Sequence, residues 1–172
     1  MNMQISYENN VEDMVALTTH QLETNSAYKK RRTLYIIGSP LLILFCFVVF
    51  GVVAVKPAYI IGGIVGALFS FVWYWRAYRN YPRKAVEQTL KNKPQKELFC
   101  RHTVTITPEG ITEQTSESQN FHTWNALVEV AHTPEYIFVY NTPATAHVIP
   151  LRELGDTLFQ QVMDEIRKYK IA

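Results

Sequence analysis

The sequence is poor in the residues that would indicate a disulfide framework or a nucleic-acid partner. Its 172 residues include two cysteines, Cys46 inside a long apolar block and Cys100 well beyond it. Such a pair does not form the network of bridges found in small secreted proteins, and it fits thiols that stay reduced. The net charge is only +2, whereas a nucleic-acid footprint needs basic residues clustered on one face of a folded domain. We therefore expect no disulfide and no nucleic-acid partner.

Recognisable motifs for catalysis and for cofactors are also lacking. The sequence has no nucleophile elbow, no P-loop and no dinucleotide-binding glycine turn. The C-terminal histidines have no second ligand at the spacing of a zinc site, so we expect structural or surface roles for them. They are His102, His122, His132 and His147. The carboxylates on turns and outer strand faces should be solvated, namely Glu109, Glu113, Glu117, Glu129 and Glu135. We expect no enzyme activity, no cofactor and no metal site.

Charge is absent from two neighbouring stretches. Residues 34–55 read LYIIGSPLLILFCFVVFGVVAV, which reaches about 33 Å as a helix and can cross a hydrocarbon core. Residues 58–75 read AYIIGGIVGALFSFVWYW, which is barely long enough to span. A buried soluble helix is the alternative for the first run, but that run has no polar stripe for water. A secretory signal fits poorly, because the run starts late and a second run follows. The two runs predict a transmembrane hairpin.

Cations flank this hairpin and predict its orientation. Lys and Arg favour the cytoplasmic side of a membrane, and only Lys56 lies between the two runs. Both termini should therefore be cytoplasmic, with the chain in the cytoplasmic (inner) membrane. The cations that determine this topology are Lys29, Lys30, Arg31 and Arg32 before the first run, and Arg76, Arg79, Arg83 and Lys84 after the second.

Small residues recur at every fourth position of the second run. Small side chains let another helix backbone approach closely. The neighbour is either the first run of the same chain, presenting Gly51 or Ala54, or a second copy of the chain. The predicted helix-packing residues are Ala58, Gly62, Gly66 and Ser70.

The polar segments around the hairpin predict further elements. Residues 1–33 contain an alternating strand at 3–7 and an amphipathic helix from Asn10. Residues 76–95 predict a basic connector helix with Pro82 in its first turn. In residues 96–172, period two predicts strands over 98–107, 111–115, 120–124, 127–132, 136–141 and 146–150, and an amphipathic helix follows from Asp156. These strands predict a small, partly closed barrel plugged by that helix, with the N-terminal strand at an edge.

Short motifs in this last segment resemble the YcxB-like family of bacterial membrane proteins. They are PEGI at 108–111, WNALVEV at 124–130, YIFVY at 136–140 and VIP at 148–150. The family pattern also has a polar N-terminal segment and paired spans, so the resemblance covers nearly the whole chain. A basic residue expected straight after the closing proline is Leu151 here, with Arg152 one position later. The resemblance implies a pleckstrin-homology-like fold and no established catalytic activity.

The predicted fold class is therefore an α+β membrane protein. A two-helix transmembrane hairpin carries a small antiparallel barrel or sheet of pleckstrin-homology-like type, capped by a C-terminal helix. The expected domain core includes Trp124, because large aromatic residues dominate the packing of small barrels. The other expected core residues are Val104, Ile106 and Phe138.

The function we expect is that of a membrane-anchored cytosolic interaction or regulatory module. Its expected partners are the lipid bilayer and a protein of unknown identity. One alternative is a homo-oligomeric channel or transporter subunit assembled through the second run, and another is an enzyme with an unrecognised site. Phosphoinositide binding on the first strand loop, residues 107–110, is not expected because Glu109 makes this loop acidic.

Overall fold

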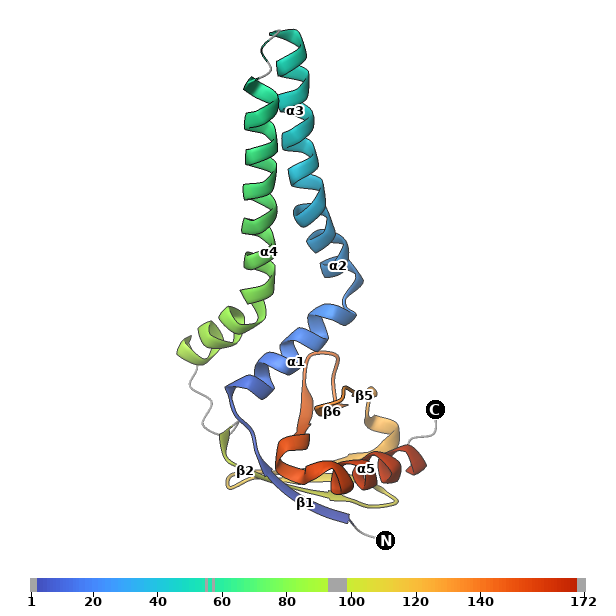
Figure 1. Ribbon diagram of the computed structural model, residues 1–172. Coiled ribbons are helices and arrows are strands. Elements are labelled where there is room, and N and C mark those ends of the chain that lie inside the picture. The colour runs from blue at the N-terminus through green and yellow to red at the C-terminus, as the bar shows by residue number, and fades with distance from the viewer. Residues whose placement is uncertain (1–2, 55, 57, 93–98, 170–172) are drawn as a thin grey trace. The chain divides into compact units, whose positions relative to one another are not determined.

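The computed structural model describes residues 3–54, 56, 58–92 and 99–169. The chain forms two compact units. The helical unit is Thr18–Glu87, and the sheet unit combines Met1–Leu17 with Gln88–Ala172. Figure 1 shows the long helices of the first unit and the strands of the second. The sheet unit is thus assembled from both ends of the chain.

Two long helices make up most of the helical unit. The first is continuous over 28 residues, Ser26–Val53. It consists of α2 (Ser26–Thr33), the π-helical turn η1 (Leu34–Gly38) and α3 (Ser39–Val53). The second is α4 (Ala58–Asn92), with 35 residues. Both are long and apolar enough to cross a membrane, and only 6% of the apolar window of each is buried inside the protein. Their apolar side chains therefore face outward.

Prolines shape both helices. Pro40 lies in the first turn of α3. It has no N–H to donate to the carbonyl of Ile36, and the wider turn η1 comes directly before it. Pro82 lies inside α4, so the prediction that a separate helix begins there was wrong. The helix continues through this proline, and Figure 1 shows α4 bent toward its C-terminal end. The predicted end of the connector and the start of the next segment, residues 93–98, lie outside the described residues.

The sheet unit contains two antiparallel sheets. The first has the order β1 (Met3–Glu8), β2 (Arg101–Ile106), β3 (Gly110–Gln114) and β4 (Gln119–Thr123). The second has the order β5 (Glu129–His132), β6 (Tyr136–Tyr140) and β7 (Ala146–Pro150). β1 pairs with β2 from Met3 opposite Ile106 to Glu8 opposite Arg101. The N-terminal strand at a sheet edge is therefore confirmed.

The predicted partly closed barrel is not what these strands form. Over the described residues, strand pairing divides them into two separate sheets. The 3₁₀ turn η3 (Trp124–Ala126) lies between β4 and β5 and interrupts the ladder. A barrel needs each strand to pair on both sides, and this interruption leaves β4 as an edge.

The main core draws on both sheets and on α5 (Leu151–Tyr169). Gly155 has φ 72°, the left-handed conformation that glycine adopts without strain, and it breaks α5 after its first turn. The helix predicted from Asp156 is the part after this break. Its buried residues follow the helical period, as expected: Phe159, Val162, Met163 and Ile166.

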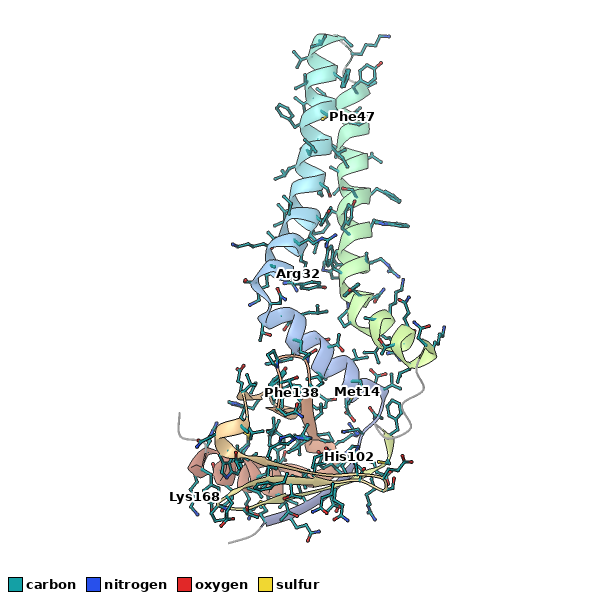
Figure 2. All side chains as sticks on the ribbon, turned by 180° about the vertical axis from the view of Figure 1, so that it is seen from behind. Met14, Arg32, Phe47, His102, Phe138 and Lys168 are labelled. Atoms are coloured by element: carbon teal, nitrogen blue, oxygen red, sulfur yellow. The ribbon has the colours of Figure 1, made fainter. Side chains whose placement is uncertain are left out.

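The second sheet is covered on both faces, which explains the nearly continuous apolar sequence of β6 and β7. Ile137 and Ile149 belong to the main core, whereas Phe138 belongs to a second cluster. Helix α1 (Val11–Thr24) packs Met14 and Leu17 against this second cluster, and Figure 2 labels Met14 and Phe138. The four expected core residues are all buried: Val104, Ile106, Trp124 and Phe138.

Candidate functional site

The two long helices pack through glycine near the middle of the hairpin. A Cβ atom on Gly63 would lie 2.5 Å from the Cβ of Phe47, so a larger residue does not fit without a shift. Figure 2 labels Phe47 on α3. Farther along α4, a Cβ on Gly66 would lie 3.4 Å from Ile43, and Ser70 is buried. The contact therefore follows residues 63, 66 and 70.

Only part of the predicted small-residue stripe takes part in this contact. Ser70 is buried and Gly66 is half-buried, but Ala58 and Gly62 are exposed. A step of four residues advances about 400° around a helix, so a strict four-residue stripe drifts by about 40° per step. On the first helix, Gly51 is buried and a Cβ there would lie 3.0 Å from Ile60. A Cβ on Gly62 would still lie 3.6 Å from the ring of Phe47, so Gly62 borders the contact, whereas Ala58 is exposed at the start of α4.

The predicted topology cations lie on α2 and α4. Most of them are exposed, and Arg83 forms an ion pair with Glu87 at 3.1 Å. Arg32 differs from its neighbours because it is half-buried. The exposed members of the set are Lys29, Lys30, Arg31, Arg76, Arg79, Arg83 and Lys84.

Arg32 and Arg79 line the same cleft. This cleft has a volume of about 390 Å³ and lies between α1, α2 and α4. Its walls also carry Glu23, Tyr28 and Tyr78, together with apolar side chains of η1 and α4. The cleft is therefore a mixed site, with two guanidinium groups, one carboxylate and several aromatic rings.

Aromatic contacts hold the walls of the cleft in place. The ring centroids of Tyr28 and Tyr78 lie 5.8 Å apart in an edge-on arrangement. The guanidinium of Arg79 lies over the ring of Trp75, 5.4 Å from its centroid. Among the residues that the structure describes, neither Arg32 nor Arg79 has a carboxylate within 4 Å. Both guanidinium groups therefore remain available to an anion.

A second polar constellation lies inside the sheet unit. Glu113 of β3 accepts a hydrogen bond from Nδ1 of His102 on β2 at 3.0 Å. Its other oxygen lies 2.9 Å from Nδ1 of His147 on β7. The side chain of Glu113 is only 12% exposed, and each histidine side chain is 7% exposed. One carboxylate thus joins the two sheets, and Figure 2 labels His102 among their strands.

Burial alone would raise the pKa of Glu113, but the hydrogen bonds from His102 and His147 outweigh it and lower this pKa to about 2. The expectation that Glu113 is a solvated surface carboxylate was therefore wrong. Glu113 lies two residues after buried Ile111 on the same strand, and a two-residue period places both on one face.

Within the described part of the chain, no group of three or more His, Cys, Asp or Glu residues is arranged to hold a metal ion.

A third constellation ties the N-terminal segment to α5. Asp13 is fully buried and accepts two hydrogen bonds from the guanidinium of Arg152, one of them 2.8 Å long. Arg152 also donates to the carbonyl of Glu8 at 2.9 Å. Asp13 completes a capping box, in which it accepts from the N–H of Asn10 at 2.7 Å. The first turn of α1 is therefore anchored to the start of α5.

A family comparison matches part of the sheet unit. Residues 106–164 match the family described as YcxB-like protein. The chain carries a YcxB-like domain. This finding confirms the resemblance drawn from the short motifs, and it places the YcxB-like domain from the end of β2 into α5. No curated protein and no solved structure matches the chain.

The YcxB-like domain relies on residues outside the matched segment. Glu113, His147 and Arg152 lie inside it, whereas His102 and Asp13 lie before it. The sequence predicts a helix from Asn10, but it indicates no cationic partner for Asp13 in the first turn of that helix. The partner is Arg152. It lies two residues after Pro150, one position later than the basic residue that the family pattern predicts.

Proposed function

We propose that the two long helices cross a membrane as a hairpin and hold the sheet unit in the cytoplasm, where it binds a protein partner or regulates another membrane component. The observation that carries this proposal is the exposed apolar surface of both helices. Leu34 is 66% exposed, Phe50 66% and Phe69 68%. Soluble monomers rarely expose apolar patches larger than a few hundred Å², and a bilayer would cover this one.

The pairing of β1 with β2 supports an even number of crossings. Glu8 lies before both long helices and Arg101 lies after them, yet these two residues are paired in one sheet. This pairing supports a chain that, if it enters a membrane after Glu8, returns to the same side before Arg101. The cations at both ends of the hairpin, with only Lys56 between the helices, favour the cytoplasm for that side.

A binding role for the sheet unit is supported by its β4 edge. Within the described residues of this unit, the large hydrophobic side chains that stay exposed are Phe121, at 53%, and Val128, at 54%. Phe121 lies on β4, which has a sheet partner on one side only. An open strand edge with an apolar side chain is a common place for an extended segment of a protein partner to add. The proposed role is non-catalytic.

Cysteine accessibility tests the topology. Lys56→Cys and Glu117→Cys are made separately, in full-length protein with Cys46 and Cys100 changed to Ser. A membrane-impermeant maleimide should label Lys56→Cys in intact cells, and Glu117→Cys only after permeabilisation. Labelling of Glu117→Cys in intact cells would refute the cytoplasmic placement.

Site-specific crosslinking tests the partner. A photoreactive phenylalanine analogue replaces Phe121, and in the matched control it replaces Glu109, which is also exposed but lies on the turn between β2 and β3. We expect an adduct with one membrane-associated protein from position 121 and none from position 109. Adducts with the chain itself alone, or equal adducts from both positions, would count against a partner at β4.

A further inference from the structure

The cleft between α1, α2 and α4 has the composition of a phospholipid headgroup site, and the inference drawn from it rests on the proposed membrane hairpin. Trp75 and Tyr78 line the cleft beside the ends of the two apolar stretches. Tryptophan and tyrosine favour the headgroup layer of a bilayer. In a hairpin with cytoplasmic ends, the cleft would therefore open at the cytoplasmic membrane surface.

The charges of the cleft match one phosphodiester. Arg32 and Arg79 contribute two positive charges and Glu23 contributes one negative charge, which leaves the cleft with one positive charge. This balance favours a headgroup with a single negative charge over a zwitterionic one, and Glu23 opposes headgroups that carry several phosphates.

The geometry of the cleft suits a phosphate on its cationic side. Guanidinium groups bind phosphate oxygens through paired, charge-assisted hydrogen bonds. Arg79 is held over the ring of Trp75, so less conformational entropy is lost when it binds. The volume of about 390 Å³ falls in the lower part of the range for small-molecule sites. It accommodates a headgroup with its glycerol, and Ile36 offers an apolar wall for the start of an acyl chain.

We propose that this cleft binds one anionic glycerophospholipid, with its phosphate between Arg32 and Arg79. The bound lipid fills the space between α1 and the foot of the hairpin. The site selects a singly charged lipid and differs from general attraction of cations to an acidic surface, because it uses two particular arginines from two different helices.

Lipid retention by the full-length protein tests the proposal. The protein is reconstituted in vesicles with equal amounts of phosphatidylglycerol and phosphatidylcholine, extracted in mild detergent, and the lipids that remain bound are measured by mass spectrometry. The cleft variant is Arg32→Gln with Arg79→Gln. The matched control is Lys30→Gln with Arg76→Gln, which removes the same number of charges from the same two helices but leaves the cleft intact.

We expect the wild type and the control to retain phosphatidylglycerol selectively, with less than about a twofold difference between them. The cleft variant should retain about tenfold less, as expected from the loss of charge-assisted hydrogen bonds to phosphate. Glu23→Gln should raise retention, a gain that a misfolded protein would not show. Equal losses in both double variants, no selectivity in the wild type, or preference for phosphatidylethanolamine when it replaces phosphatidylcholine would overturn the proposal.

Carbonate extraction of the membranes separates the two proposals. A chain that carbonate releases is not a transmembrane hairpin, and the lipid site then fails with it. A chain that stays in the membrane but retains no phosphatidylglycerol refutes the lipid site alone.

Discussion

Removal of the Arg152 guanidinium should destabilise the sheet unit, because it leaves the carboxylate of Asp13 buried without its cation. Asp13 has no exposed surface, whereas the side chain of Arg152 is 38% exposed. Breaking a buried ion pair by deleting one partner costs about 3–5 kcal/mol. Water can reach part of this site through the exposed arginine, so we expect Arg152→Ala to lower the free energy of unfolding by about 2–3 kcal/mol.

Arg152→Lys should have a smaller effect. Lysine keeps the positive charge, but its donors all sit on one nitrogen and do not reproduce the planar fork with which Nη1 and Nη2 of Arg152 reach Asp13 and the carbonyl of Glu8. The expected loss is about 1–2 kcal/mol, the worth of one or two hydrogen bonds.

Urea unfolding in mild detergent measures these changes in the full-length chain. In a background with Trp73→Phe and Trp75→Phe, Trp124 is the single tryptophan, and it is buried against Tyr169 in the sheet unit. Its fluorescence therefore reports on this unit, while circular dichroism follows the helices. With a slope of about 1.5 kcal/mol per M urea, Arg152→Ala should lower the midpoint by about 1–2 M.

The control is Arg167→Ala, which removes an exposed arginine from the same helix, α5. It should change the free energy of unfolding by less than about 0.5 kcal/mol. If Arg152→Ala falls within the same limit, the buried pair is not stabilising and the reasoning is refuted. The double variant Asp13→Asn with Arg152→Gln should cost less than the sum of the single variants, because it leaves no buried charge.

Further predictions concern the other sites. Since the pKa of Glu113 is lowered from its ordinary 4.5 to about 2, its contribution is present above pH 4.5 and lost as the pH falls toward 2. Glu113→Gln should therefore cost about 2–3 kcal/mol in urea unfolding at neutral pH, and a loss that does not shrink toward pH 2 would contradict this origin. Trp124→Ala should cost about 3–5 kcal/mol, and Trp124→Phe only about 1–2, mainly through the lost 2.9 Å hydrogen bond to the carbonyl of Thr107. Gly63→Leu should separate the hairpin helices and reduce disulfide trapping between cysteines placed across them, whereas Ala58→Leu, at an exposed position of α4, should not. If Ala58→Leu instead abolishes crosslinked oligomers, the exposed face of α4 is a contact between copies.

Much of the fold follows from local periodicity. Alternation over residues 3–7 predicts β1, and the helical spacing after Asp156 predicts the main part of α5, because both patterns record which side chains face the core. The division into two sheets was not predictable in the same way. It depends on η3, where Trp124 turns its ring into the core and its Nε1 toward the carbonyl of Thr107, and that is a tertiary contact.

The candidate sites also combine features that the sequence shows locally with features that depend on tertiary contacts. The cations near the hairpin are visible in the sequence, but only the rotation of α2 and the position of α1 place Arg32, and not Arg31, in the cleft. Glu113 could have been assigned to the core face from Ile111, two residues earlier. The hydrogen bond between Glu113 and His147 could not have been predicted from this spacing, because His147 belongs to the other sheet.

The pairing of β1 with β2 also has a consequence for biosynthesis. A ribosome completes β1 about 90 residues before it reaches β2, a delay of about 5–20 s at ordinary translation rates. During that time both long apolar helices are synthesised, and β1 has no partner strand. A fragment that begins after α1 would never acquire this strand or the carboxylate that receives Arg152, so the matched segment cannot be produced in its native form as a simple C-terminal piece.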